Sequence, residues 1–178
     1  ETAARSAGHL SAVLARMRRF TNLDRAEVMQ VNLEDLLRDV ASMLEPETRG
    51  AVEVDLRCEP LPRVTVRPQQ ISAVFANLLH KAARANGGKG RVTIHARPHN
   101  SHLEVIIRDE GPGIPPRDLA SFFEPSFRVA GSRVTGANWS LFSSRQIVRE
   151  HGGDVKVYSD PDRGTNVIVV LPTGTLPH

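Results

Sequence analysis

The sequence contains little cysteine, few aromatic residues and no long apolar run, and each shortage excludes a class of protein. Its 178 residues include a single cysteine, Cys58, so no disulfide can form within the chain. No apolar stretch approaches the ~18 residues of a membrane-spanning helix. Aromatic residues make up 4% of the chain, so its core must consist mainly of Val, Leu, Ile and Ala. Because 40% of the residues are hydrophobic, we still expect a cytoplasmic domain with a buried core.

The charge balance gives little support for a nucleic-acid partner, and we expect none. The formal net charge is +3, and only residues 15–20 form a dense basic run. The chain also lacks the aromatic residues interleaved with basic ones that single-strand binders use. It begins at Glu1 and has no signal-peptide pattern. We therefore expect a piece of a longer protein, whose attachment to a membrane is left open.

Residues 3–20 show the periodicity of an amphipathic helix. The apolar positions follow the spacing i, i+3, i+4, i+7: Leu10, Val13, Leu14 and Met17. This stripe is as narrow as a coiled-coil seam, which favours pairing with a helix of a second chain. The alternative is a helix that folds back onto the core of its own domain. We expect the first arrangement, and therefore a homodimer of the full-length protein through this helix.

The rest of the chain alternates helical and strand patterns. A helix is predicted at residues 31–46, with Asn32 as its N-cap and Pro46 as its end. Further helices are predicted at residues 68–86, beginning on Pro68, and at about 140–151. Alternating apolar residues predict strands at 52–58, 63–66, 91–96, 103–109, 154–159 and 165–172. The irregular stretch that ends near residue 138 has few apolar anchors and predicts a mobile flap.

The order of these elements indicates the fold class. Short turns join several consecutive strands, which excludes an all-parallel, doubly wound sheet. An α/β two-layer sandwich is favoured instead, with one mixed sheet and helices on a single face, preceded by the N-terminal helix.

Asp109 is the first candidate for a ligand-binding residue. It ends a predicted strand and is followed by Gly111 and Gly113 in the segment DEGPGIP. A carboxylate at that place can accept a hydrogen bond from an amino-bearing base, and glycines let a flat ring approach the backbone. The alternative is a turn in which the Asp109 side chain caps the backbone.

Polar residues on the helix at 68–86 form the second candidate group. Asn77 and Lys81 are four residues apart and share one face, and Arg84 follows three residues later. The two cations could neutralise phosphates near Asp109. The alternative is an ordinary solvated helix face.

Four motifs in this order make the chain resemble the ATP-binding catalytic domain of sensor histidine kinases, in the GHKL (Bergerat-fold) superfamily. They are the N box at 69–86, the first glycine box at 109–115, the F box FFEPSF at 122–127, and the second glycine box at 136–153. The resemblance implies the Bergerat fold for residues 29–178. It also implies that residues 1–28 are the C-terminal helix of a dimerisation and phosphoacceptor hairpin, with its linker.

The resemblance implies roles for the residues around an adenine ring. Asp109 would accept a hydrogen bond from the adenine amino group. Gly111 and Gly113 would shape the pocket, and Thr165 would approach the same ring. The cofactor implied is ATP.

The lid that the resemblance places at about 126–138 departs from the family pattern. Its glycine-rich end and the following helix N-terminus would clamp the phosphates. Of the motif G-x-G-x-G only Gly136 remains, because Asn138 and Ser140 replace the other glycines. Asn138 tolerates a positive φ, whereas we expect Ser140 to adopt one at a cost of about 1 kcal/mol. We expect Trp139 to fill space where the triphosphate would lie.

The N box departs from the pattern at its metal ligand. The second asparagine, the family's magnesium ligand, is Lys81 here, and a charged ammonium has no lone pair to offer a cation. Lys81 would offset phosphate charge itself, and Arg84 matches a basic position that the family directs at the nucleotide. Gyrase-like members carry a glutamate at the position of Asn77, where it acts as the base that activates water. The amide of Asn77 cannot take up a proton in this way, so this residue favours the kinase branch of the superfamily. We assign no metal ligand and leave magnesium open.

Two functions follow from these observations. One is the catalytic domain of a two-component sensor kinase, which moves the γ-phosphoryl of ATP to a histidine on a partner helix and serves a response regulator. The other is a pseudokinase-type module that docks a response regulator or partner kinase without ATP chemistry. The changes at Lys81 and in the lid favour a degenerate site with weak, metal-free or no ATP binding. His9 lacks the acidic neighbour of the family's phosphoacceptor, so we assign no phosphoacceptor or other catalytic residue.

Overall fold

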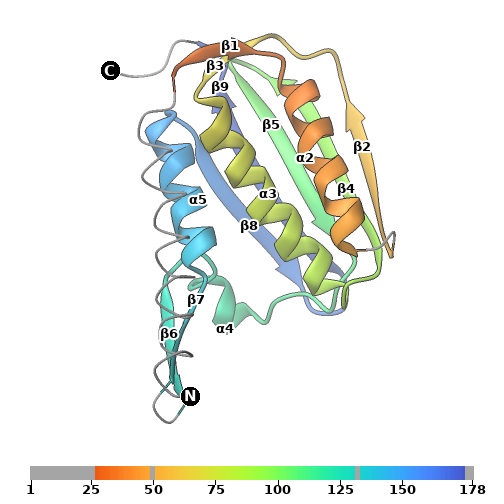
Figure 1. Ribbon diagram of the computed structural model, residues 1–178, viewed down its shortest axis with the longest axis vertical. Coiled ribbons are helices and arrows are strands. Elements are labelled where there is room, and N and C mark those ends of the chain that lie inside the picture. Colours follow the sequence, from red (N-terminus) through yellow and green to blue (C-terminus); the bar gives the residue numbers. More distant parts are fainter. Residues whose placement is uncertain (1–26, 49–50, 131–132, 175–178) are drawn as a thin grey trace, which may run out of the picture.

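The structure, a computed structural model, describes residues 27–48, 51–130 and 133–174 (Figure 1). The helices are α2 (Leu33–Thr48), α3 (Pro68–Ala85), α4 (Pro116–Leu119) and α5 (Trp139–Glu150). The strands are β1 (Met29–Val31), β2 (Val52–Cys58), β3 (Val64–Val66), β4 (Gly90–His99), β5 (His102–Asp109), β6 (Ser126–Ala130), β7 (Arg133–Ala137), β8 (Asp154–Asp160) and β9 (Gly164–Pro172). The helix predicted at residues 3–20 lies outside the described residues, so the domain boundary at residue 28 stays a prediction.

Two layers make up the domain, as predicted. The main sheet has the strand order β2-β4-β5-β9-β8, in which β2 runs parallel to β4 and the other neighbours are antiparallel. The helices α2, α3 and α5 cover one face of this sheet (Figure 1). The mixed α/β sandwich with helices on a single face is therefore confirmed.

The alternation of side chains along the sheet decides what faces the helices. In β5 and β9 the residues buried under the helices occur at every second position: Leu103, Val105 and Ile107, and Val167, Val169 and Leu171. Asp109 continues the same series at the end of β5. The regular pleat thus carries one carboxylate to the helix side of the sheet, beside the apolar core.

The central helix α3 follows its sequence signals closely. Pro68 occupies the first turn, and the helix ends at the C-cap Asn86, before Gly87 with a φ of 69°. The helix buries an apolar stripe of Ile71, Val74, Phe75, Leu78 and Ala82, and it also buries Leu79 and Ala83. These additional residues are buried because α3 packs against α2 and α5 on its flanks as well as against the sheet.

The structure differs from the sequence prediction in three segments. The strand predicted at 63–66 does not join the main sheet, because β3 pairs with β1 in a separate two-stranded sheet. The helix α2 continues through Pro46 to Thr48. The stretch at 126–138 is not irregular: β6 and β7 pair antiparallel there, and a hairpin of this kind forms its backbone hydrogen bonds without core anchors (Figure 1).

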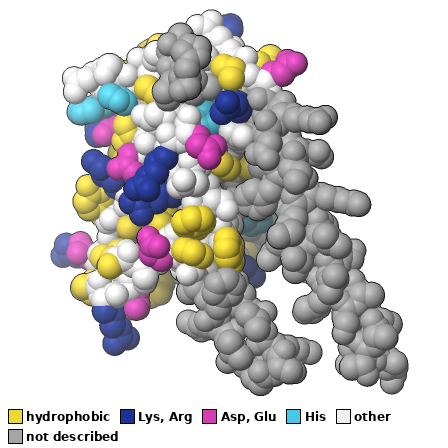
Figure 2. All heavy atoms as spheres, turned by 90° about the vertical axis from the view of Figure 1, so that its left-hand side faces the viewer, with side chains coloured by type: hydrophobic (Ala, Val, Ile, Leu, Met, Phe, Trp, Pro, Cys, Tyr) yellow, Lys and Arg dark blue, Asp and Glu magenta, His cyan; other side chains and the backbone are white. Residues whose placement is uncertain are grey.

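The side of the domain that carries α5 shows no strongly basic stripe among the described residues (Figure 2). On the side that carries α5, basic and acidic side chains lie interspersed among polar and apolar ones (Figure 2). None of the helices that the structure describes combines the length and the hydropathy that a membrane crossing requires.

His151 fastens the end of α5 to the start of α3. Its side chain is fully buried, with Nδ1 lying 2.7 Å from the carbonyl oxygen of Ile147. Its Nε2 accepts a hydrogen bond from the backbone N–H of Arg67 at 3.0 Å. This arrangement requires a neutral imidazole with its proton on Nδ1, and burial lowers the pKa of His151.

We expect this histidine to make the domain less stable in mild acid. Its folded pKa lies below 6.5, so its stabilising contribution is complete above about pH 6.5. It is lost as the pH falls from there through the folded pKa, because only the unfolded chain takes up the proton. Urea denaturation at several pH values should show that the free energy of unfolding decreases toward acid pH in the wild type. The slope of this decrease should be flatter in His151→Gln. An equal slope in both proteins would contradict the assignment, and His99→Gln, at the exposed end of β4, is the control.

Candidate functional site

The carboxylate of Asp109 lies where β5 runs into the glycine-containing loop. The residue is 5% exposed, and its Oδ1 accepts a hydrogen bond from the Gly111 N–H at 2.9 Å. Burial raises the pKa of Asp109, while hydrogen bonds from the backbone of Gly111 and Thr165 and the charge of Lys81 act in the opposite direction. The turn-capping bond considered as an alternative is thus present. A carboxylate has about four lone-pair sites, so it retains capacity for a donor on a ligand.

The glycines around Asp109 are required by contacts within the chain itself. A Cβ at Gly111 would lie 2.8 Å from the carbonyl oxygen of Ala85. Gly113, at a φ of +75°, would place a Cβ 2.1 Å from the carbonyl oxygen of Asp160. From the sequence, these glycines are expected to let a ligand approach the backbone. In the structure these glycines are needed because α3 and the β8–β9 turn pack closely against the glycine loop. This packing fixes the wall of the pocket.

Thr165 faces Asp109 across the β5–β9 pair and is 4% exposed. Its Oγ1 lies 3.0 Å from the Oγ of Ser159. The Ser159 hydroxyl also donates to the Gly164 carbonyl and accepts from the Ile114 N–H, each at 2.8 Å. Ser159 therefore joins the glycine loop to the β8–β9 turn. Sequence reasoning missed this role, because a serine in an alternating strand gives no signal of it.

Two cations and two phenylalanines form a cluster between α3 and α5. The buried rings of Phe122 and Phe123 meet edge to face, with centroids 4.8 Å apart. The exposed Lys81 places its Nζ 5.8 Å from the Phe122 centroid, and the Arg145 guanidinium lies 5.5 Å from that of Phe123. The Nε of Arg145 is buried and has no hydrogen-bond partner among the described residues. Of these two cations, Lys81 is the one whose charge acts on Asp109.

Asn77 contacts α5 and not Asp109. Its Nδ2 donates to the Oγ of Ser144 at 3.2 Å, and the fully buried Ser144 donates to the carbonyl oxygen of Ser140 at 2.7 Å. The amide oxygen of Asn77 is not used in this chain of bonds. Arg84 is exposed on α3, and its side chain makes no hydrogen bond or ion pair with any described residue, so its direction toward a nucleotide stays a prediction.

The end of the lid corrects one expectation. Asn138 precedes α5 with a φ of 65°, as its replacement of a glycine predicted. Ser140 is helical and has no positive φ, so the expected strain at this residue is wrong. Trp139 is 47% exposed, and its ring meets Phe142 edge to face at 6.1 Å. Gly136 lies in β7 opposite Phe127, and its contact with phosphates stays a prediction.

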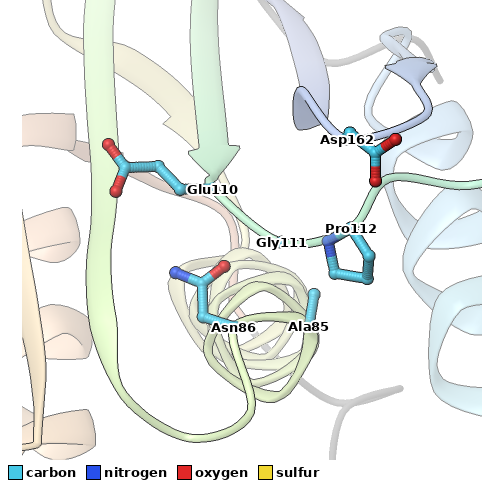
Figure 3. Close-up of a pocket in the computed structure, with 6 residues that line it drawn as sticks. All are labelled: Ala85, Asn86, Glu110, Gly111, Pro112 and Asp162. Atoms are coloured by element: carbon cyan, nitrogen blue, oxygen red, sulfur yellow. The ribbon is translucent and has the colours of Figure 1, made fainter.

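A cavity of about 340 Å³ opens between the C-terminal end of α3 and the glycine loop. Its lining residues are Ala85, Asn86, Glu110, Gly111, Pro112 and Asp162 (Figure 3). Gly111 and Pro112 pass across the end of α3, with Ala85 and Asn86 beneath them (Figure 3). The volume is at the lower end of the range for small-molecule sites.

The N box carries a lysine where the resemblance places the family's magnesium ligand. No three His, Cys, Asp or Glu side chains converge in the part of the chain that the structure describes. Lys81, at the position of the family's ligand, brings a positive charge instead of a lone pair.

Comparison with known proteins identifies relatives over most of the chain. Residues 66–175 match the family described as histidine kinase-, DNA gyrase B-, and HSP90-like ATPase. The alginate biosynthesis sensor protein KinB of Pseudomonas aeruginosa is 30% identical over 155 residues, which cover 85% of this chain and 26% of that protein. The sensor histidine kinase ZraS of Salmonella typhi is 27% identical over 173 residues, covering 95% and 36%. The chain thus spans about a quarter to a third of the length of these relatives.

Solved structures agree with this assignment. The catalytic domain of histidine kinase ThkA superposes with a TM-score of 0.71 at 25% identity, over 83% of this chain and 96% of that one. A mycobacterial sensor histidine kinase MprB structure gives a TM-score of 0.71 at 27% identity, over 85% and 100%. The chain therefore belongs to the histidine kinase-, DNA gyrase B- and HSP90-like ATPase family, as an ATP-binding catalytic domain of the sensor histidine kinase type.

Proposed function

We propose that this domain binds an adenine nucleotide without a magnesium ion held by the protein, and that Lys81 takes over part of the metal's charge. The observation that carries the proposal is the position of Lys81. Its charge acts on the buried Asp109 carboxylate, and its Nζ lies over the face of Phe122. An ammonium at this place attracts phosphate and repels a divalent cation.

The two halves of the site would contribute unequally to affinity. Asp109 retains acceptor capacity for the adenine amino group, in a buried setting where a hydrogen bond to a charged group contributes strongly. At the phosphate half of the site, the single charge of Lys81 replaces the two charges of a magnesium ion. An ammonium group also cannot reproduce the octahedral geometry of magnesium. We therefore expect weak nucleotide binding that is directed mainly by the base.

The role of the domain in a longer protein extends the proposal. Its relatives are sensor proteins, which supports a full-length sensor kinase that dimerises through the helix predicted at residues 3–20 and serves a response regulator. A phosphorylated histidine would be supplied from outside this chain. Loss of the metal ligand at Lys81 also favours a second candidate function, in which the domain docks its partners without transferring phosphate.

Isothermal titration with ATP and ADP, with and without magnesium, tests the metal-free site. We expect the wild-type domain to bind ATP no more tightly with magnesium than without it. In Lys81→Asn the amide restores an oxygen ligand and removes the repelling charge. Magnesium should then tighten ATP binding by about tenfold, whereas metal-free ATP should bind less tightly than to the wild type.

Lys89→Asn is the matched control, because it removes the same charge from the exposed loop after α3. It should leave the magnesium dependence of the wild type unchanged. Strong, magnesium-dependent ATP binding by the wild-type domain would reject the proposal, as would an unchanged magnesium response in Lys81→Asn.

A further inference from the structure

The face of the sheet that no helix covers carries several arginines that a neighbouring carboxylate neutralises. Three of them pair with a carboxylate on the same or an adjacent strand: Arg57 with Asp55 at 2.6 Å, Arg91 with Glu53 at 3.1 Å and Arg97 with Glu104 at 2.8 Å. Cross-strand pairs of this kind are the ordinary way in which a solvated sheet face balances its charge.

Arg108 and Arg163 depart from this pattern. The side chain of neither makes a hydrogen bond or ion pair with any residue that the structure describes, and both are exposed. They converge on a second cavity, of about 360 Å³. The other residues lining it are Leu119, Val157, Tyr158, Ser159, Asp160, Gly164 and Asn166.

The floor of this cavity is one row across three strands. Register places Arg108 of β5 opposite Asn166 of β9, and Asn166 opposite Tyr158 of β8. The row therefore runs from a guanidinium through an amide to an aromatic ring, and Tyr158 is 55% exposed. Val157 and Leu119 add apolar surface at the margin.

We propose that this second cavity binds a small organic anion, a phosphate or carboxylate group attached to a ring or similar apolar body. Guanidinium groups present several donors in a planar fork that matches the oxygens of either anion. Two of them face one carboxylate, that of Asp160, so the cavity retains a net positive charge. Tyr158 offers the ring of the ligand a flat surface that is otherwise in contact with water.

The second cavity is distinct from the first, and the proposal for it does not depend on nucleotide binding. The turn between β8 and β9 lies between the two: Asp162 lines the first cavity, whereas Asp160 and Arg163 line the second. The Asp162 N–H donates to the carbonyl oxygen of Pro112 at 2.9 Å, which holds the turn against the glycine loop. A ligand bound in one of the two cavities therefore does not occupy the other cavity.

Titration of the ¹⁵N-labelled 178-residue chain with phenyl phosphate tests the proposal by NMR. We expect saturable shifts at the signals of Arg108, Asn166 and Tyr158. Arg108→Gln and Arg163→Gln should each weaken binding by about tenfold, the usual loss for a charge-assisted hydrogen bond. Arg97→Gln, which removes a paired arginine from the same face, is the control and should bind like the wild type.

Further probes distinguish the contribution of the anionic group to binding from that of the ring. Benzoate in place of phenyl phosphate distinguishes a carboxylate ligand from a phosphate one, and saturable binding of either supports the site. Tyr158→Ala should weaken phenyl phosphate but leave inorganic phosphate unchanged. Shifts that do not saturate with either probe, equal affinity in both arginine variants and the wild type, or a loss seen only in Lys81→Asn would overturn the proposal.

Discussion

Replacing Asp109 with asparagine is expected to lower the affinity for adenine nucleotides by about 30-fold while leaving the fold intact. A carboxylate only accepts hydrogen bonds, whereas an amide turns one of its two positions into a donor, which opposes the adenine amino group. A hydrogen bond to a charged group contributes about 2 kcal/mol, which corresponds to this factor. Titration calorimetry of the wild type and Asp109→Asn with ADP measures the difference.

The same variant should unfold no more easily than the wild type. Because the folded pKa of Asp109 is raised, its contribution to stability is greatest in acid and is lost as the pH rises from about 3.8 through the folded pKa. Asparagine does not titrate, so the variant does not lose stability as the pH rises. Its amide oxygen can still accept the hydrogen bond from the Gly111 N–H. Asp39→Asn makes the same substitution at an exposed carboxylate on α2 and is the control. Unchanged ADP affinity in Asp109→Asn would exclude base recognition by this residue.

Gly164→Ala is expected to lower the free energy of unfolding by about 3 kcal/mol or more. Gly164 has a φ of +81°, and a Cβ there would lie 2.0 Å from the carbonyl oxygen of Asp109. The obstacle is backbone of a central strand, so it cannot move away without disturbing the β5–β9 pair. Urea denaturation followed by circular dichroism measures the loss.

Gly87→Ala separates the two causes of this loss. Gly87 has a similar φ of +69°, but nothing lies within 4 Å of the position of its Cβ. Its substitution should therefore cost only the conformational strain, about 1 kcal/mol. Equal losses in the two variants would show that the close contact at Gly164 has no separate effect.

The sequence predicts elements well where a local residue decides them. Pro68 marks the start of α3, Asn86 its end, and Asn32 the start of α2, where its Oδ1 accepts the Glu34 N–H at 3.0 Å. The separate pairing of β3 with β1 could not be foreseen in this way, because strand partners depend on the whole sheet. Pro46 likewise failed as a stop signal, since it lies in the last turn of α2.

The candidate site was predictable in its residues and less so in its contacts. Asp109 and Thr165 lie together because β5 and β9 pair in register, and motif order alone indicated both. The contact of Lys81 with Phe122 and the bond from Asn77 to Ser144 depend on how α3 packs against its neighbours. No pattern within a single segment contains that information.

The strand pairing described above also orders the events of folding. The hairpins β4–β5 and β8–β9 close over short turns and can form early, whereas β5–β9 must bring together segments that are separated by the lid and α5. Closing a long loop delays a contact, since its entropy is lost before the contact contributes. Asp109 and Thr165 meet only at this late junction. A nascent chain therefore brings Asp109 and Thr165 together only when the two halves of the sheet join.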